Sequence, residues 1–188
     1  MTEKNNINTQ TKQNGTVKLA KMGMLVAVSI VLVYFIHFPI FPAVAFLEYD
    51  PADIPILIGT FAFGPVAGIL LTVVTSVIQG LTVSAASGLY GILMHVIATS
   101  AIVLVAGIIY KKNKTRKGAV IGLVLGVIAW IIVMICANLV ITPLFMGVPR
   151  SVVIDLMPFI AAFNGIKAGV NAIITFLLYK RISGFLHK

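Results

Sequence analysis

The stretch PFIAAFNGIKAGVNAIITFLLY, residues 158–179, is long enough to cross a bilayer as one helix and carries a single charge, Lys167. A lysine at the centre of a membrane costs about 3 kcal/mol or more, so it needs a polar partner. Asn164, Lys167 and Asn171 follow one another at i, i+3 and i+7, which places them on one helix face. This face is therefore predicted to meet protein or a bound ligand rather than lipid.

The composition of the whole chain is that of an integral membrane protein. Of its 188 residues 60% are hydrophobic and only 10% are charged, and the mean hydropathy is +1.09. Soluble domains are about 25% charged. Long apolar runs recur up to the C-terminal region, so they are not a removable signal peptide.

The net charge of +9 comes from basic residues in three clusters, within residues 4–21, 111–117 and 180–188. Each cluster flanks apolar segments, where basic residues mark the cytoplasmic side of a membrane. The charge thus indicates topology rather than nucleic-acid binding. Cys136 is the only cysteine, which excludes disulfides within the chain, and no metal-binding motif is present.

Apolar segments and their breakers predict an all-α, polytopic domain over residues 17–188, preceded by a disordered cytoplasmic tail over residues 1–16. The loop over residues 38–55 holds four prolines, which oppose helix formation. A second loop is expected over residues 143–157, because Pro143 should end the fifth helix. The six expected transmembrane helices cover residues 17–37, 53–63, 66–82, 88–110, 118–141 and 158–179.

The positions of the basic clusters test this count of helices. An even number of crossings must separate clusters on the same side, so the break at Gly64–Pro65 has to divide two helices. Both termini are then cytoplasmic. The loops at 38–55 and 143–157 and the turn at 83–87 lie on the outer side.

Polar residues gather toward the outer ends of the predicted helices, beneath the apolar loop at 38–55. A pocket with an apolar lid and a few converging polar groups is typical of a small-molecule site. The acidic side chains beyond the tail are all expected outside. The residues concerned are Glu48, Asp50, Asp53, Tyr90, Met94, His95, Asn138, Asp155, Asn164 and Lys167.

Packing roles remain open for several of these residues. Lys167 could pair with an acid such as Glu48. Asn138, Asn164 and Asn171 could hold helices together, and this role is expected for Asn171. His95 is expected to be a hydrogen-bonded core histidine. Asp50 and Asp53 could cap the second helix.

Small residues mark two helix faces where another helix could approach closely. Ala20, Gly23 and Ala27 form one such face on the first helix, for packing within the protein or for a partner. Gly118, Gly122 and Gly126 form the other, which we expect to serve internal packing.

The sequence lacks a phosphate-binding loop, a Ser–His–Asp set and a H-E-x-x-H motif, so we expect neither ATP hydrolysis nor another enzyme activity. It also shows no inverted repeat of the kind that builds many secondary transporters. The sequence therefore predicts a membrane protein that has a pocket but no energy source of its own.

These motifs resemble the S components, the substrate-capture subunits, of energy-coupling factor vitamin transporters, and most closely the riboflavin-specific ones. The resemblance covers residues 17–182. It rests on EYDPADIP at 48–55, the Gly59, Phe63–Gly64–Pro65 and Gly68 run, Gly88, Gly91 and Met94–His95, and NGIK at 164–167 followed by Asn171.

The resemblance implies a six-helix protein of the bacterial cell membrane that captures riboflavin as a transported ligand, with no cofactor. Its partners would be a transmembrane scaffold subunit and two ATPase subunits. Members of the family dock the scaffold through small residues on the first helix, usually Ala-x-x-x-Ala. This chain has Gly23 in place of the first alanine, and Ala20 and Ala27 complete that face.

Riboflavin has an apolar ring with polar edges and a hydroxylated chain, which suits the predicted pocket. Asn164 and Lys167 are expected to bind polar groups deep in the site, with help from Asn138. Glu48 would bind hydroxyls. The lid residues would be Ala45, Phe46 and Leu47, and the ring contacts Tyr90 and Met94.

Other functions stay open at this stage: an S component for pantothenate or thiamine, a haem-anchoring subunit using His37 and His95, or a purely structural subunit. Replacing Lys167 with Met is expected to lower riboflavin affinity without unfolding the protein.

Overall fold

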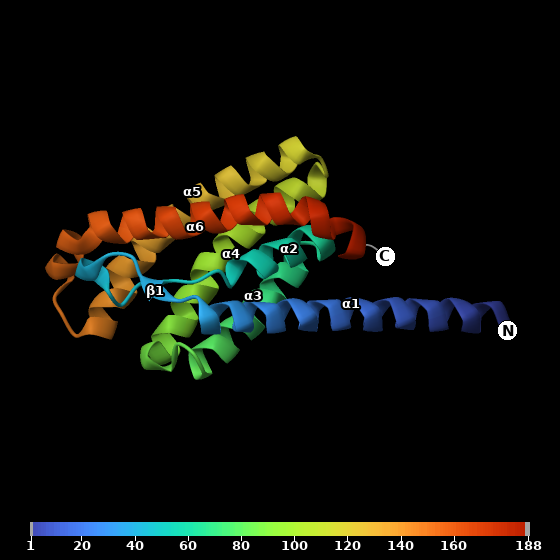
Figure 1. Cartoon of the computed structure of the whole chain (residues 1–188), viewed down its shortest axis with the longest axis horizontal. Coiled ribbons are helices and arrows are strands. Elements are labelled where there is room, and N and C mark those ends of the chain that lie inside the picture. Colours follow the sequence, from blue (N-terminus) through green and yellow to red (C-terminus); the bar gives the residue numbers. More distant parts are fainter. Residues whose placement is uncertain (1, 187–188) are drawn as a thin grey trace.

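The computed structural model describes the backbone of residues 2–186 and contains six α-helices in that range (Figure 1). Two short 3-10 helices, η1 and η2, and a two-stranded sheet interrupt the helical order. The bounds are α1 Thr2–Phe35, β1 Phe38–Pro39, η1 Pro42–Val44, β2 Glu48–Tyr49, α2 Asp53–Phe63, α3 Pro65–Leu81, η2 Ala85–Ser87, α4 Gly88–Lys112, α5 Arg116–Met146 and α6 Arg150–Leu186.

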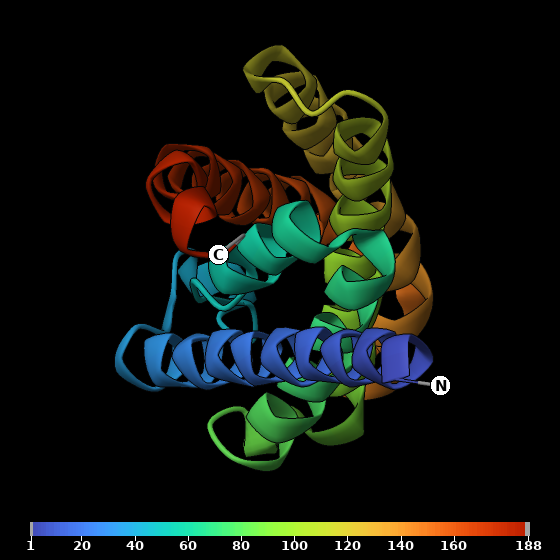
Figure 2. The same ribbon diagram turned by 90° about the vertical axis from the view of Figure 1, so that its right-hand side faces the viewer.

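The short helix α2 forms the centre of the bundle. Nine of its 11 residues are buried, and in the end-on view it is surrounded by the other helices (Figure 2). At 1.5 Å per residue it is only about 16 Å long. Gly64 ends it with φ 94°, a left-handed backbone that favours glycine, and Pro65 begins α3. The predicted separation of these two helices is confirmed.

Glycines allow α5 to approach α4 closely. A Cβ at Gly122 would lie 3.1 Å from the backbone oxygen of Ala106, and one at Gly126 would lie 2.7 Å from Ile102 Cγ1. These separations are shorter than ordinary side-chain contacts. The internal packing expected for Gly122 and Gly126 is thus confirmed.

The predicted ends of the fifth and sixth helices were wrong. Pro143 lies inside α5, which continues to Met146 and ends at Gly147 with φ 64°. Pro158 lies inside α6, which begins at Arg150. Each proline removes one backbone donor, a loss that membrane helices tolerate when neighbouring groups compensate. The loop predicted over 143–157 is therefore only the short connection at 147–149.

The N-terminal segment also differs from the expectation. The structure continues α1 back to Thr2, whereas composition predicted a disordered tail over residues 1–16. Extending an existing helix costs far less than nucleating a new one, and the segment contains no proline to stop it.

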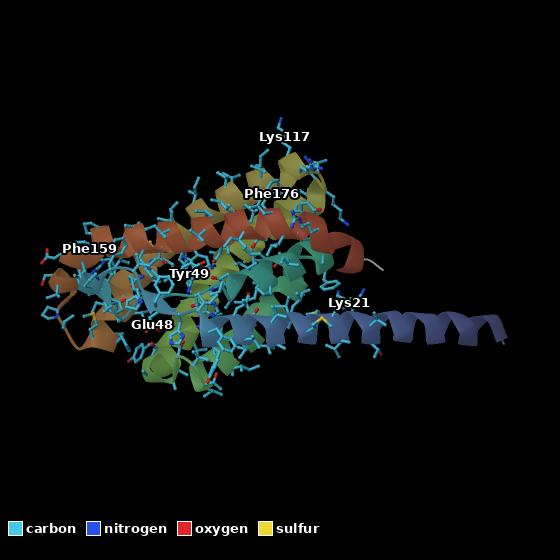
Figure 3. All side chains as sticks on the ribbon, in the orientation of Figure 1. Lys21, Glu48, Tyr49, Lys117, Phe159 and Phe176 are labelled. Atoms are coloured by element: carbon cyan, nitrogen blue, oxygen red, sulfur yellow. The ribbon has the colours of Figure 1, made fainter. Side chains whose placement is uncertain are left out.

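Both chain ends and the connection between α4 and α5 lie toward the same end of the bundle (Figure 1). Lys21 and Lys117 mark that end among the side chains (Figure 3). Four helical segments of the described chain are long and apolar enough to span a membrane: 15–35, 85–112, 116–146 and 150–179. The helices α2 and α3 are apolar but shorter. This arrangement agrees with the polytopic helical fold predicted from sequence.

Candidate functional site

A cavity opens near the end of the bundle opposite the termini. Together with the solvent-open space at its mouth it holds about 980 Å³ free of protein atoms. Apolar walls with a few converging polar groups are typical of a small-molecule site. Eight predicted residues line it: Phe46, Leu47, Glu48, Tyr90, Met94, Asn138, Asn164 and Lys167.

The segment between α1 and α2 covers one side of the cavity. Phe38 and Pro39 pair with Tyr49 and Glu48 in an antiparallel register that folds the segment back on itself. Val44 packs with Val153 and Ile160 of α6 in a small apolar cluster. Ala45, which was predicted as a lid contact, is exposed and does not line the cavity, because it ends the 3-10 helix η1.

Aromatic side chains form the apolar wall of the cavity. The ring of Phe145 lies 5.6 Å from that of Tyr90 and 6.4 Å from that of Phe46, measured between centroids. Phe145 belongs to the last turn of α5, beyond Pro143. Its role was missed because the helix was predicted to end at residue 141.

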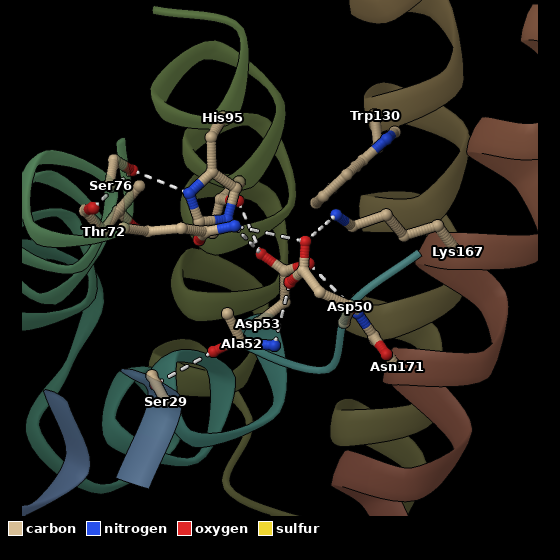
Figure 4. A network of polar contacts seen from close by, with 12 residues as sticks. Ser29, Asp50, Ala52, Asp53, Thr72, Ser76, His95, Trp130, Lys167 and Asn171 are labelled. Atoms are coloured by element: carbon tan, nitrogen blue, oxygen red, sulfur yellow. Dashed lines mark hydrogen bonds and ion pairs between the residues drawn. The ribbon is translucent and has the colours of Figure 1, made fainter. Parts of the chain in front are cut away.

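Lys167 is buried, and its Nζ lies 2.7 Å from Oδ2 of Asp50 (Figure 4). Lys167 does pair with an acid, as one alternative predicted, but the acid is Asp50 and not Glu48. Glu48 contributes its backbone carbonyl, at 3.5 Å, and not its side chain. Of the two predicted possibilities, protein or a bound ligand, it is therefore the protein itself that compensates the ammonium.

Asp50 and Asp53 are buried, although both were predicted to lie outside with the other acids. The Asp50 carboxylate accepts a hydrogen bond from the backbone N–H of Ala52, 3.1 Å away, just before α2 begins. This contact resembles the predicted capping role. Asp53 makes no such cap. Its carboxylate instead accepts from Thr99 Oγ1 at 2.6 Å and from Asn171 Nδ2 at 3.0 Å.

Asn171 ties α6 to the residues before α2. Its Nδ2 also donates to the backbone oxygen of Asp50, and its Oδ1 accepts from the Tyr49 hydroxyl at 3.0 Å. Burial raises the pKa of Tyr49, and the nearby Asp50 carboxylate adds to this, so the phenol remains a donor. These contacts fit the packing role expected of Asn171.

Two amides in the cavity wall keep spare hydrogen-bonding capacity. Asn164 accepts from Trp130 Nε1 at 2.8 Å and donates to the Ile160 carbonyl. Asn138 donates to the Met134 carbonyl and accepts from Thr142. A primary amide has two N–H groups and two lone pairs, so each side chain retains one donor and one acceptor for a ligand.

Several lining residues were not predicted: Ser76, Gln79, Ser84, Trp130, Phe145 and Phe163. Gln79 was a detectable signal, since an amide inside the apolar helix α3 needs a partner. It donates weakly to Asp50 at 3.4 Å and to Ser84 at 3.3 Å. Trp130, the only tryptophan, gave no polar pattern from which a site could be inferred.

The two histidines proposed for a haem are engaged in other ways. Both ring nitrogens of His95 have partners, Ser76 Oγ at 2.9 Å and Asp53 Oδ1 at 3.2 Å. Nδ1 of His37 lies 2.9 Å from the Val33 carbonyl. His95 is therefore the hydrogen-bonded core histidine that was expected, and the haem alternative gains no support.

Asp50, Asp53 and His95 place potential metal-ligand atoms within 4.8 Å of one another. The sequence predicted no such cluster, because His95 lies on a different segment from Asp50 and Asp53. However, Lys167 already contacts Asp50, and His95 contacts Asp53. Side chains of the protein thus already contact both carboxylates, and we assign no metal here.

The family model for the substrate-specific component of ECF transporters matches residues 17–179. The chain belongs to this family. Membership confirms the expected resemblance and makes the protein a membrane transport component, not an enzyme.

Two riboflavin transporters align with almost the whole of this chain. It is 32% identical over 178 residues to the riboflavin transporter RibU of Staphylococcus aureus, covering 91% of this chain and 93% of the relative. It is 27% identical over 185 residues to the riboflavin transporter FmnP of Bacillus subtilis, covering 91% and 94%. A solved structure of the S component of a bacterial ECF transporter matches with a TM-score of 0.78 at 32% identity, over 94% of this chain and 99% of that one.

Proposed function

We propose that this chain captures riboflavin from the outer side of the bacterial cell membrane, as the substrate-binding subunit of an ATP-driven uptake transporter. The observation that carries the proposal is the cavity. The amides of Asn138 on α5 and Asn164 on α6 line it together with aromatic side chains. The riboflavin transporters among its relatives support the choice of ligand.

The polar groups of the cavity suit the edges of the isoalloxazine ring. Asn138 and Asn164 each offer one donor and one acceptor, which can match the ring's adjacent carbonyl and imide groups. Lys167 has three N–H donors, of which Asp50 occupies one at 2.7 Å and the distant Glu48 carbonyl takes a weak second. Its remaining donor is available to a ring carbonyl.

The apolar and rim residues supply the remaining contacts. Tyr90 and Met94 would pack against the ring, while Phe46 and Leu47 would close the loop over it. Aromatic stacking adds about 0.5–1.5 kcal/mol beyond the burial of surface. Glu48, whose side chain is exposed at the cavity rim, would accept hydrogen bonds from ribityl hydroxyls.

The transport partners are a transmembrane scaffold subunit and two ATPase subunits, which would supply the energy that this chain lacks. Ala20, Gly23 and Ala27 are all exposed on α1. A Cβ at Gly23 would meet no atom within 4 Å, so this face is open to another helix. We assign scaffold docking to it, with both termini on the cytoplasmic side.

Ligand capture can be tested with the purified full-length protein. Mass spectrometry of the ligand released on denaturation should find riboflavin, and adding riboflavin to ligand-free protein should quench flavin fluorescence. Excess pantothenate or thiamine should not compete. A folded protein that fails to bind riboflavin but binds another vitamin would overturn the assignment.

A matched pair of variants tests the site itself. Asn164→Ala should weaken riboflavin binding by roughly tenfold, as expected for a lost hydrogen bond and an unpaired group. Asn113→Ala, in the exposed connection after α4, should leave it unchanged. Equal affinities in the two variants would contradict the assigned binding site.

A further inference from the structure

His95 of α4 links α3 and α2 at the wall of the cavity (Figure 4). Its ring lies between Ser76 of α3 and Asp53 of α2, and it also lines the cavity wall. The donors and acceptors around the ring determine which of its nitrogens carry protons.

The Nδ1 side of the ring requires a proton on nitrogen. Ser76 has one hydroxyl hydrogen, which it donates to the carbonyl of Thr72 at 2.6 Å. Its oxygen can then only accept in the 2.9 Å contact with His95. Nδ1 of His95 must therefore be the donor.

The contact between Nε2 of His95 and the Asp53 carboxylate also requires a proton. Nε2 lies 3.2 Å from Oδ1 of Asp53, and that oxygen also accepts from Thr99 at 2.6 Å. Asn171 donates to the other carboxylate oxygen. A carboxylate that accepts hydrogen bonds on both oxygens is stabilised in its ionised form, so the shared proton stays on nitrogen.

We infer that His95 is held as an imidazolium and is a positioning residue of the ligand site. With this charge the buried network is neutral overall: Asp50 balances Lys167, and Asp53 balances His95. Without it, Asp53 would be a buried carboxylate with no cation of its own, which is strongly unfavourable.

The network connects His95 to the ligand site through Lys167. The Lys167 ammonium lies 2.7 Å from Oδ2 of Asp50, and a carboxylate oxygen of Asp53 lies within 4.8 Å of one of Asp50. The imidazolium satisfies Asp53 and so leaves Lys167 on Asp50, where one N–H remains free for the ligand. Loss of the charge would attract the ammonium toward Asp53 and withdraw it from the cavity.

The titratable and charged groups around His95 come from few elements. Asp53 belongs to α2, Asp50 and Glu48 to the segment before it, and Lys167 to α6. His37, which follows α1, and Tyr90 of α4 line the same cavity, so His37→Gln is a further control for the pH dependence. Ser76, the side chain of α3 that contacts His95, is neutral. Because the competent state carries this proton, riboflavin affinity should fall where a higher pH removes it.

The protonation state can be measured directly, and this measurement does not depend on the identity of the ligand. Full-length protein with ¹⁵N-labelled histidine in lipid nanodiscs, with His95→Gln for assignment, should show both ring nitrogens protonated near neutral pH. The spectrum of a neutral tautomer for His95 at that pH would overturn the inference.

The positioning role rests on the proposed riboflavin function and is tested by charge rescue. Wild-type affinity should decline as the pH is raised, whereas the affinity of His95→Gln should be about tenfold weaker or more and insensitive to pH. The double variant with Asp53→Asn removes both charges and should recover most of the affinity. Asp155→Asn, an exposed acid of α6, is the control for a lost carboxylate.

The outcomes separate the two proposals. Failure of the wild-type protein to bind riboflavin would contradict the proposed function alone, since the nitrogen spectrum would still report the imidazolium. A pH-independent wild-type affinity, or a double variant as weak as His95→Gln, would show that His95 acts only as a packing residue and would overturn its positioning role. Thermal unfolding of each variant distinguishes lost binding from lost folding.

Discussion

Removal of Lys167 tests the central ion pair of the site. The Nζ–Oδ2 distance is 2.7 Å, and 9% and 6% of the two side chains are exposed. Lys167→Met would leave Asp50 buried with only the Ala52 N–H and the weak Gln79 amide bond. Breaking such a buried pair costs about 3–5 kcal/mol. The melting temperature of the ligand-free protein should fall by roughly 6–20 °C, at about 2–4 °C per kcal/mol for a chain of this length.

Adding Asp50→Asn to Lys167→Met separates stability from ligand binding. The double variant removes both charges, and replacement of a buried pair by neutral groups is often close to neutral in stability. It should therefore unfold near the wild-type temperature. Riboflavin binding should stay weaker by roughly 10- to 150-fold, because a hydrogen bond from a charged group contributes about 1.5–3 kcal/mol.

Thermal unfolding followed by tryptophan fluorescence and riboflavin titration of the same samples measure both quantities. Recovery of stability together with full recovery of affinity in the double variant would refute the reasoning. Lys167 would then serve only to neutralise Asp50. The simpler expectation from sequence, that Lys167→Met lowers affinity without affecting folding, ignored this buried carboxylate.

Two further substitutions test packing and docking. Gly126→Val should destabilise the protein by about 1–3 kcal/mol in thermal unfolding, since the valine side chain would overlap Ile102. Gly169→Ala is the control and should not destabilise the protein, because a Cβ added there meets nothing within 4 Å. Gly23→Leu should leave riboflavin binding intact but abolish co-purification with the scaffold and ATPase subunits. Retained co-purification would show that the partner binds elsewhere.

Local properties of the chain were sufficient to predict the membrane fold. Apolar runs must be helical in lipid, because their backbone groups have no water to bond with. The break at Gly64–Pro65 needed no tertiary information either, since a proline and a glycine with φ 94° set it locally. The prolines at 143 and 158 were misjudged, because a missing backbone donor can be accommodated in the last or early turns of a long helix.

The sequence also determined that Lys167 needs a polar partner, since no charge is stable alone in an apolar helix. Only the tertiary structure decided which partner it has. Asp50 lies 117 positions away, and Asp53 meets His95 across 42 positions. Such pairings depend on how α2 enters the bundle and where the first loop folds back, and no local pattern encodes a distance between separate helices. Asp50 and Asp53, which were expected at the surface, are buried in the fold and pair with Lys167 and His95.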